Sequence, residues 1–265
     1  MTYRAVRVLG EVTCIAAEDT RHTRKLLAHY EIHTELISYH EHNKDERGSL
    51  LIARLLQGEN IACVSDAGYP AISDPGEDLA KRAIAAGIPV TVLPGANAAL
   101  PALIGSGLNA TRFSFIGFLP RTAHHRQELL AEIKDRRDTL LFYEAPHRLF
   151  ATLQELQQAL GNRKAVLARE LTKRFEEYLR HDLAGLCQYY ETHTPRGEFV
   201  IVVAGCDAET MIKTKTQDVS PLAMAQRLLD EGCSPKEASR QAAQTFHLSR
   251  REVYQALLTR KQDGD

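Results

Sequence analysis

The chain has 265 residues, of which 44% are hydrophobic and 25% charged, and its formal net charge is −1. These proportions are typical of a globular protein with room for two domains, and the near-neutral charge excludes a global field attracting nucleic acid. Five single cysteines without a Cys-x-x-Cys pair argue against structural zinc and disulfides, and with no signal-peptide or membrane-spanning run they predict a cytoplasmic protein.

The first half alternates short apolar runs with helical patterns. After a helix ending near residue 9, strands are predicted at 12–17, 36–39, 61–64 and 88–93, and helices over the Arg21 segment, 45–57, 77–86 and 98–105. Four strand-and-helix units before residue 112 predict a parallel sheet with crossover helices.

The second half is less regular, so a mixed sheet is expected. Strands are predicted at 112–118, 139–143, 164–171 and 199–203, and helices at 122–137, 149–160 and 183–192. The first of these strands is the expected junction, which divides the chain into an N-terminal α/β domain over 1–117 and a C-terminal one over 118–206. Residues 207–218 are polar and are typical of a linker.

Residues 220–262 change character and predict three short helices. Each begins with serine as N-cap, at Ser220, Ser234 and Ser249, and the first two have proline at the next position. Tight turns between short helices indicate a helix-turn-helix-like tail. Seven Lys/Arg against four Asp/Glu give this tail a balance of +3. The tail is therefore expected to bind RNA, with a helical packing appendage as the alternative.

Two loops that follow predicted strands expose their backbone. Residues 65–76 contain Gly68, Pro70 and Gly76, and residues 94–98 follow the strand at 88–93, with Asn97 as the N-cap of the next helix. Ligands of open α/β sheets bind at the carboxyl ends of strands. Neither loop is a Walker or Gly-x-Gly-x-x-Gly motif, so the ligand is not expected to be a nucleotide held by its phosphates. Two ordinary strand-to-helix turns remain the alternative.

His40 and His42 suggest a metal, but no third ligand stands at a suitable spacing. A polar loop is the favoured interpretation, and no metal site is expected.

Eight short runs stand in a characteristic order, namely 17–23 (Ala-Glu-Asp-Thr-Arg-His-Thr), 65–68, 74–76, 94–97, 117–121, 143–148 (Tyr-Glu-Ala-Pro-His-Arg), 169–173 and 197–198. In this order they resemble the tetrapyrrole-methylase-like family. Within it they are similar to the branch that uses S-adenosylmethionine to methylate a cytidine 2′-oxygen in 16S rRNA of the small ribosomal subunit. The resemblance covers residues 4–205, and the tail is expected to share it.

The resemblance implies two α/β domains around a cleft, a homodimer, and S-adenosylmethionine held largely by main-chain atoms. The cofactor-binding residues that it implies are Ser65, Asp66, Ala67, Gly68, Tyr69, Pro94, Gly95, Ala96, Asn97, Ala98, Tyr143, Glu144, Ala145, Gly197, Glu198 and Phe199.

Removing the ribose proton calls for a general base. Glu170, Glu144 and Asp19 are the main candidates, with Glu198 as a further one. The expected phosphate contacts are Arg21, Arg24, Arg148, Arg169 and Lys173. Two other functions stay open, namely a methyltransferase of tetrapyrroles and a non-catalytic RNA-binding protein with a degenerate cofactor pocket.

The sequence departs from the resembled family at its start. Family members open with a strand and a Gly-Thr-Pro-Ile-Gly-Asn-Leu type loop, whereas this sequence begins in the following helix. The chain as written is therefore expected to bind S-adenosylmethionine weakly. Restoring about 20 preceding residues, the reach of one strand with its loop, is expected to recover binding.

Overall fold

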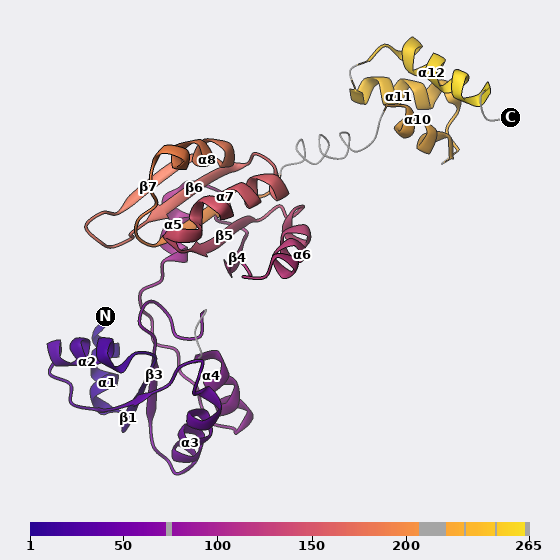
Figure 1. Cartoon of the computed structure of the whole chain (residues 1–265). Helices are drawn as coiled ribbons and strands as arrows, with labels where there is room; N and C mark the ends of the chain where they lie inside the picture. Colours follow the sequence, from indigo (N-terminus) through magenta and orange to yellow (C-terminus); the bar gives the residue numbers. More distant parts are fainter. Residues whose placement is uncertain (73–75, 207–220, 231, 247, 263–265) are drawn as a thin grey trace.

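A computed structural model describes residues 1–72, 76–206, 221–230, 232–246 and 248–262 (Figure 1). It consists of an α/β region with a parallel sheet, an α/β region with a mixed sheet, and a helical tail, which confirms the predicted fold class. None of the helices in these residues is both long and apolar enough to cross a membrane.

The first region is built around one fully buried strand. Its elements are α1 (Tyr3–Glu11), β1 (Cys14–Ala17), α2 (Thr20–His29), β2 (Glu35–Ser38), α3 (Lys44–Leu56), β3 (Ile61–Val64) and α4 (Gly76–Ala85). The sheet order is β2-β1-β3, with all strands parallel. Alternate β1 side chains face opposite cores: Cys14 and Ala16 join Leu51, whereas Ile15 packs with Leu9.

The prediction of a strand at residues 88–93 is wrong. These residues form no strand, and the exposed fractions of Val90 and Val92 are 46% and 71%. The physical reason is pairing, because an alternating apolar pattern becomes a strand only against a neighbouring backbone. Among the described residues β3 pairs with β1 alone, so residues 88–93 do not add to the free edge of β3 and their backbone has no strand partner.

The second region contains a five-stranded sheet in the order β4-β5-β8-β6-β7. Its elements are β4 (Phe113–Phe118), α6 (Ala123–Ile133), β5 (Thr139–Glu144), α7 (Pro146–Leu160), β6 (Lys164–Arg169), β7 (Glu177–Asp182), α8 (Leu183–Thr192) and β8 (Phe199–Val203). Only the β4–β5 pair is parallel, so the sheet is mixed as predicted. Because β4 pairs with β5, β4 belongs to the mixed sheet, and the domain boundary at residue 117 stays a prediction.

Helix α5 (Ala99–Ser106) links the two regions. It follows the first region in the chain but packs on β6 and β8 of the second sheet. Ala102 and Leu103 are buried there against Val166 and Val202, whereas α7 and α8 cover the opposite face. The loop that precedes α5 is therefore carried to the second sheet.

The tail is a three-helix unit with a core of its own, as predicted. Helices α10 (Pro221–Asp230), α11 (Pro235–Phe246) and α12 (Arg250–Gln262) bury Ala225, Ala242 and Val253 together. Ser234 caps α11 as expected, because its Oγ accepts from the N–H of Glu237 at 3.3 Å. The predicted linker at 207–218, the Ser220 cap and residues 73–75 of the first loop lie outside the described residues.

Candidate functional site

The loop after β3 is tied to the loop after β1, because parallel strands end at the same edge of a sheet. The N–H of Asp19 donates to Asp66 Oδ1 at 3.2 Å, and the N–H of Asp66 donates to Glu18 Oε2 at 3.3 Å. His22 Nδ1 lies 3.7 Å from Asp66 Oδ2. His22 is a neighbour that the sequence analysis missed, although its place in the 17–23 run was a usable signal.

The two predicted cofactor loops of the first region contact each other. The N–H of Gly95 donates to the hydroxyl of Tyr69 at 3.0 Å. Asn97 Oδ1 accepts from the N–H of Leu100 at 2.9 Å, so Asn97 ties the second loop to the start of α5. The predicted N-cap differs by one residue, because the helix begins at Ala99 with Ala98 as its N-cap, although the Asn97 side chain accepts from the first turn.

The backbone of these loops is accessible at its glycines. Gly68 has a φ of +78°, and a Cβ there would lie 3.9 Å from the carbonyl oxygen of Ala96. A Cβ on Gly95 would meet nothing within 4 Å. Ser65 donates to the carbonyl of Ala67 at 3.3 Å, which closes the turn on itself. Close approach to main-chain atoms is what a ligand held by N–H and C=O groups requires.

A second set of predicted residues meets at one end of the mixed sheet. Phe199, the first residue of β8, pairs with Glu144 at the end of β5 and with Arg169 at the end of β6. The runs 143–145 and 197–199, which lie far apart in the sequence, therefore become neighbours across this sheet end.

Glu170 anchors that sheet end. Its Oε1 accepts from the N–H of Glu198 at 2.9 Å and from Lys173 Nζ at 3.0 Å, and Lys173 also pairs with Glu198 Oε2 at 2.9 Å. The backbone N–H of Glu198, followed by the Lys173 ammonium, holds the pKa of Glu170 below its usual range. Glu170 is therefore a carboxylate at neutral pH.

Gly197 makes this arrangement possible. Its φ is +85°, a conformation that costs a residue with a Cβ about 1–2 kcal/mol. A Cβ at this position would also lie 2.5 Å from Cγ of Glu170 and 2.7 Å from its Oε1. Only glycine allows Glu170 to lie directly against the 196–198 turn.

Glu144 has a structural environment, although it was a candidate base. Its side chain is fully buried, and it accepts from the N–H of Ala145 at 2.9 Å and the hydroxyl of Thr152 at 2.6 Å. Nε of Arg148 lies 3.7 Å from Glu144 Oε1, and Nη2 of Arg148 donates to the carbonyl of Leu119 at 3.1 Å. These contacts fix the start of α7 and leave Glu144 little access to a substrate.

The two sets of loops are brought toward one another by α5. Ala98 and Tyr143 both pack against the apolar cluster beneath α5 on the second sheet. Tyr178 donates from its hydroxyl to the carbonyl of Pro101 at 3.1 Å, which fastens α5 to β7. The 94–98 loop and the 143–145 run therefore contact one cluster.

Four of the five predicted RNA-contacting cations have protein partners. Arg21 binds Asp19 through two nitrogens, at 3.1 Å and 2.7 Å, and this pairing lowers the pKa of Asp19 well below its usual range. Arg169 donates to the carbonyl of Arg196 at 2.7 Å, and Lys173 and Arg148 were described above. Arg24 is exposed on α2, one turn beyond Arg21. Most of these cations are therefore held by protein partners in the predicted cofactor loops or next to them.

His40 and His42 stack edge to face at 6.0 Å, and the Asn43 side chain lies within hydrogen-bonding distance of His40 at 3.4 Å. In the part of the chain that the structure describes, no three His, Cys, Asp or Glu side chains are grouped to hold a metal ion.

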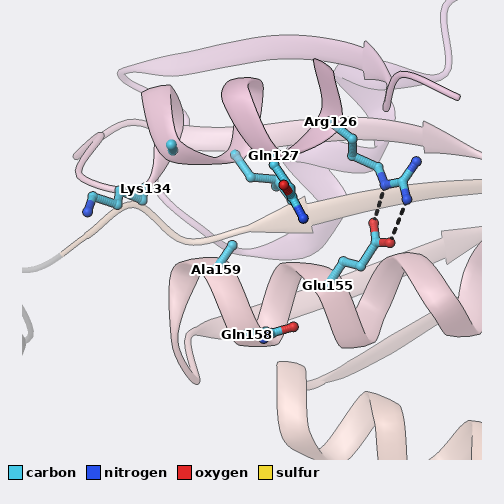
Figure 2. Close-up of a pocket in the computed structure, with 8 residues that line it drawn as sticks. Arg126, Gln127, Lys134, Glu155, Gln158 and Ala159 are labelled. Carbon is cyan, nitrogen blue, oxygen red and sulfur yellow. Dashed lines mark hydrogen bonds and ion pairs between the residues drawn. The ribbon is translucent and has the colours of Figure 1, made fainter. Parts of the chain in front are cut away.

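A hollow of about 370 Å³ between α6 and α7 is a separate feature (Figure 2). Figure 2 shows Arg126 of α6 reaching across to Glu155 of α7, where two hydrogen bonds of 2.5 Å and 2.9 Å join them. Gln127, Gln158 and Lys134 also line it. None of its lining residues was predicted for the cofactor or the RNA, so the loops above remain the candidate site.

Comparison with protein families gives two matches along the chain. Residues 1–187 match the family described as Tetrapyrrole (Corrin/Porphyrin) Methylases. Residues 216–261 match the RsmI C-terminal HTH domain.

Curated relatives align over nearly the whole chain. A Halalkalibacterium halodurans protein named ribosomal RNA small subunit methyltransferase I is 46% identical, and the alignment covers 96% of this chain and 88% of that protein. A Synechocystis protein of the same name is 45% identical, and the alignment covers 100% of this chain and 94% of that protein.

Solved structures share the fold at low identity. The methyltransferase CobJ has a TM-score of 0.59 at 17% identity, with 78% of this chain and 88% of that one covered. A Thermus thermophilus uroporphyrin-III C-methyltransferase complexed with S-adenosyl homocysteine has a TM-score of 0.50 at 19% identity, covering 76% and 90%.

Proposed function

The chain belongs to the tetrapyrrole methylase family, and we propose that it is an S-adenosylmethionine-dependent methyltransferase of small-subunit ribosomal RNA that acts on a cytidine 2′-oxygen. The observation that carries this proposal is the match at 46% identity to an rRNA small subunit methyltransferase, over both α/β regions and the tail. The solved tetrapyrrole-pathway enzymes share the fold at 17% and 19% identity, which supports the architecture alone.

The cofactor is proposed to lie against the loops of both regions. Residues 65–69 and 94–98 offer main-chain groups at glycines with open surroundings. The runs 143–145 and 197–199 offer main-chain groups at the neighbouring ends of β5 and β8. S-adenosylmethionine supplies an electrophilic methyl group on a sulfonium centre. The protein therefore mainly has to position the acceptor oxygen in line and accept its proton.

Among the candidate bases, Glu170 is best placed for that role. Its carboxylate is ionised and has 18% of its side-chain surface exposed, whereas the side chain of Glu144 has none. The pKa of Asp19 and that of Glu170 are both lowered, but Arg21 binds both carboxylate oxygens of Asp19. Within the described residues the hydrogen bonds of Glu170 engage its Oε1, which leaves Oε2 to accept a proton. We therefore assign Glu170 to orienting and deprotonating the ribose hydroxyl, with Asp19 and Glu144 as residues that shape the cleft.

The RNA is proposed to lie along the cations beside the cleft. Arg21, Arg24, Arg148, Arg169 and Lys173 come from both α/β regions, and the basic tail would add affinity away from the reacting nucleotide.

A homodimer in the cytoplasm completes the proposal. An apolar surface is available for association, since the exposed fractions of Ile104 and Leu100 on α5 are 75% and 48%, and Phe118 on β4 is 50% exposed. Exposed apolar surface of this kind favours burial between subunits. Light scattering on the purified chain tests the dimer.

Isothermal titration with S-adenosylmethionine, followed by labelled methyl transfer, tests the activity. Binding together with methyl incorporation into small-subunit rRNA is the expected result. Cofactor binding with incorporation only into a tetrapyrrole would indicate that other substrate class. RNA binding without cofactor binding would indicate a non-catalytic protein.

A further inference from the structure

The tail contains a basic hollow that no part of the cofactor cleft explains. It has a volume of about 490 Å³ and is lined by Lys236 of α11, by Ser249, and by Arg250, Arg251 and Tyr254 of α12. The two helices are held at this angle by the tail's own core, in which Val253 packs with Ala242. The hollow is therefore a built feature of the helical unit.

The three cations of this hollow are available for a ligand. Lys236, Arg250 and Arg251 are exposed, and within the described residues no carboxylate pairs with any of them. Arg240, one turn along α11 from Lys236, is different, because it pairs with Glu237 at 2.5 Å. Among the described residues, the hollow thus gathers three positive charges without an ion pair, whereas nearby Arg240 is paired with Glu237.

Tyr254 gives the hollow an aromatic wall. It lies one turn after Arg250 and Arg251 on α12, and its side chain is partly buried. A positively charged groove beside an aromatic ring is the combination that holds single-stranded nucleic acid, because the cations contact phosphates and the ring stacks on a base. An acidic peptide would use the cations but would have no need of the ring.

We propose that Lys236, Arg250, Arg251 and Tyr254 form an RNA-binding site that holds a single-stranded segment of the substrate, with phosphates on the cations and one base on the tyrosine. This inference rests on the proposed rRNA substrate and specifies which residues of the tail bind that RNA. The site is chemically separate from the cleft, so it contributes to RNA affinity and leaves cofactor binding alone.

The test uses the full chain and fluorescence anisotropy with a fluorescein-labelled, cytidine-rich single-stranded RNA and with transcribed small-subunit rRNA. The triple variant K236Q/R250Q/R251Q is expected to lose roughly ten- to hundredfold in RNA affinity at low salt. The slope of its log association constant against log salt concentration should become shallower by about two, because fewer counterions are released on binding. Arg250→Gln alone should weaken binding more than Arg240→Gln, the matched control with the same charge change in the same unit. Tyr254→Phe should retain affinity, whereas Tyr254→Leu should lose about tenfold.

Three outcomes decide the matter. If the triple variant binds RNA as tightly as the wild type, and the wild type methylates rRNA, the proposed site is wrong and the proposed function still holds. If the wild type transfers no methyl group to rRNA but the variants still lose RNA affinity, the proposed site is supported and the proposed function is wrong. Equal competition by poly-glutamate and by RNA would identify the hollow as a site for acidic protein instead. Circular dichroism confirms that each exposed substitution leaves the helices folded.

Discussion

Replacing Gly197 by alanine tests whether the Glu170 contact positions the cleft. The substitution places a Cβ 2.5 Å from Cγ of Glu170, on a backbone with a φ of +85°. The left-handed backbone costs about 1–2 kcal/mol. Glu170 must then move, which removes its charge-assisted hydrogen bond from the N–H of Glu198, worth about 1.5–3 kcal/mol.

Together these terms destabilise the folded chain by about 2.5–5 kcal/mol, and solvent screening of the exposed Lys173 and Glu198 favours the lower figure. Gly58 provides the matched control. Its φ is +90°, and a Cβ there would meet nothing within 4 Å. Gly58→Ala should therefore cost only the backbone term of about 1–2 kcal/mol.

The assay combines urea unfolding with calorimetric titration of S-adenosylmethionine. Gly197→Ala should lower the free energy of unfolding by more than Gly58→Ala does, and should weaken cofactor binding, which Gly58→Ala should leave unchanged. If the two variants are equally stable and bind the cofactor equally well, the close packing of Glu170 on Gly197 does not position the site.

Three further changes probe other parts of the chain. Thr152→Val leaves Glu144 Oε2 without its buried donor and should cost about 1–3 kcal/mol in urea unfolding; an unchanged unfolding midpoint would refute the structural role of Glu144. Glu170→Gln should slow methyl transfer about 100-fold or more with little change in cofactor affinity. Because the pKa of Glu170 is lowered, its carboxylate stays ionised until the pH falls below the usual glutamate pKa. The wild-type rate should therefore not decline as the pH is lowered to about 5. A decline that begins near neutral pH would assign the base to another group. Deleting residues 220–265 should weaken rRNA binding and leave cofactor titration unchanged, whereas lost cofactor binding would make the tail a structural brace.

The contacts between loops were predictable wherever strand topology determines them. Parallel strands end at one edge, so the approach of the Asp66 loop to the Asp19 loop followed from the order of the strands. The same reasoning failed for residues 88–93, because a strand depends on a partner as well as on its own pattern, and among the described residues no strand pairs with this segment.

Side-chain roles were less predictable than positions. The 143–148 run located Glu144 at the right sheet end, but only the structure shows that Thr152, from the following helix, buries and binds its carboxylate. The i,i+3 spacing of Glu237 and Arg240 on one helix indicates their ion pair, but no pattern in the sequence shows that Lys236 lies beside Arg250 and Arg251 of the next helix. That proximity arises from packing between helices, which periodicity does not encode.

The most direct test of the account is nucleoside mass spectrometry of small-subunit rRNA after incubation with the chain and labelled S-adenosylmethionine. Enzyme and cofactor are used in excess over RNA, so that a single turnover suffices to label the RNA. The account predicts label in 2′-O-methylcytidine, and loss of that label with Glu170→Gln. Label on a base, or no label in RNA from a chain that binds the cofactor, would contradict it.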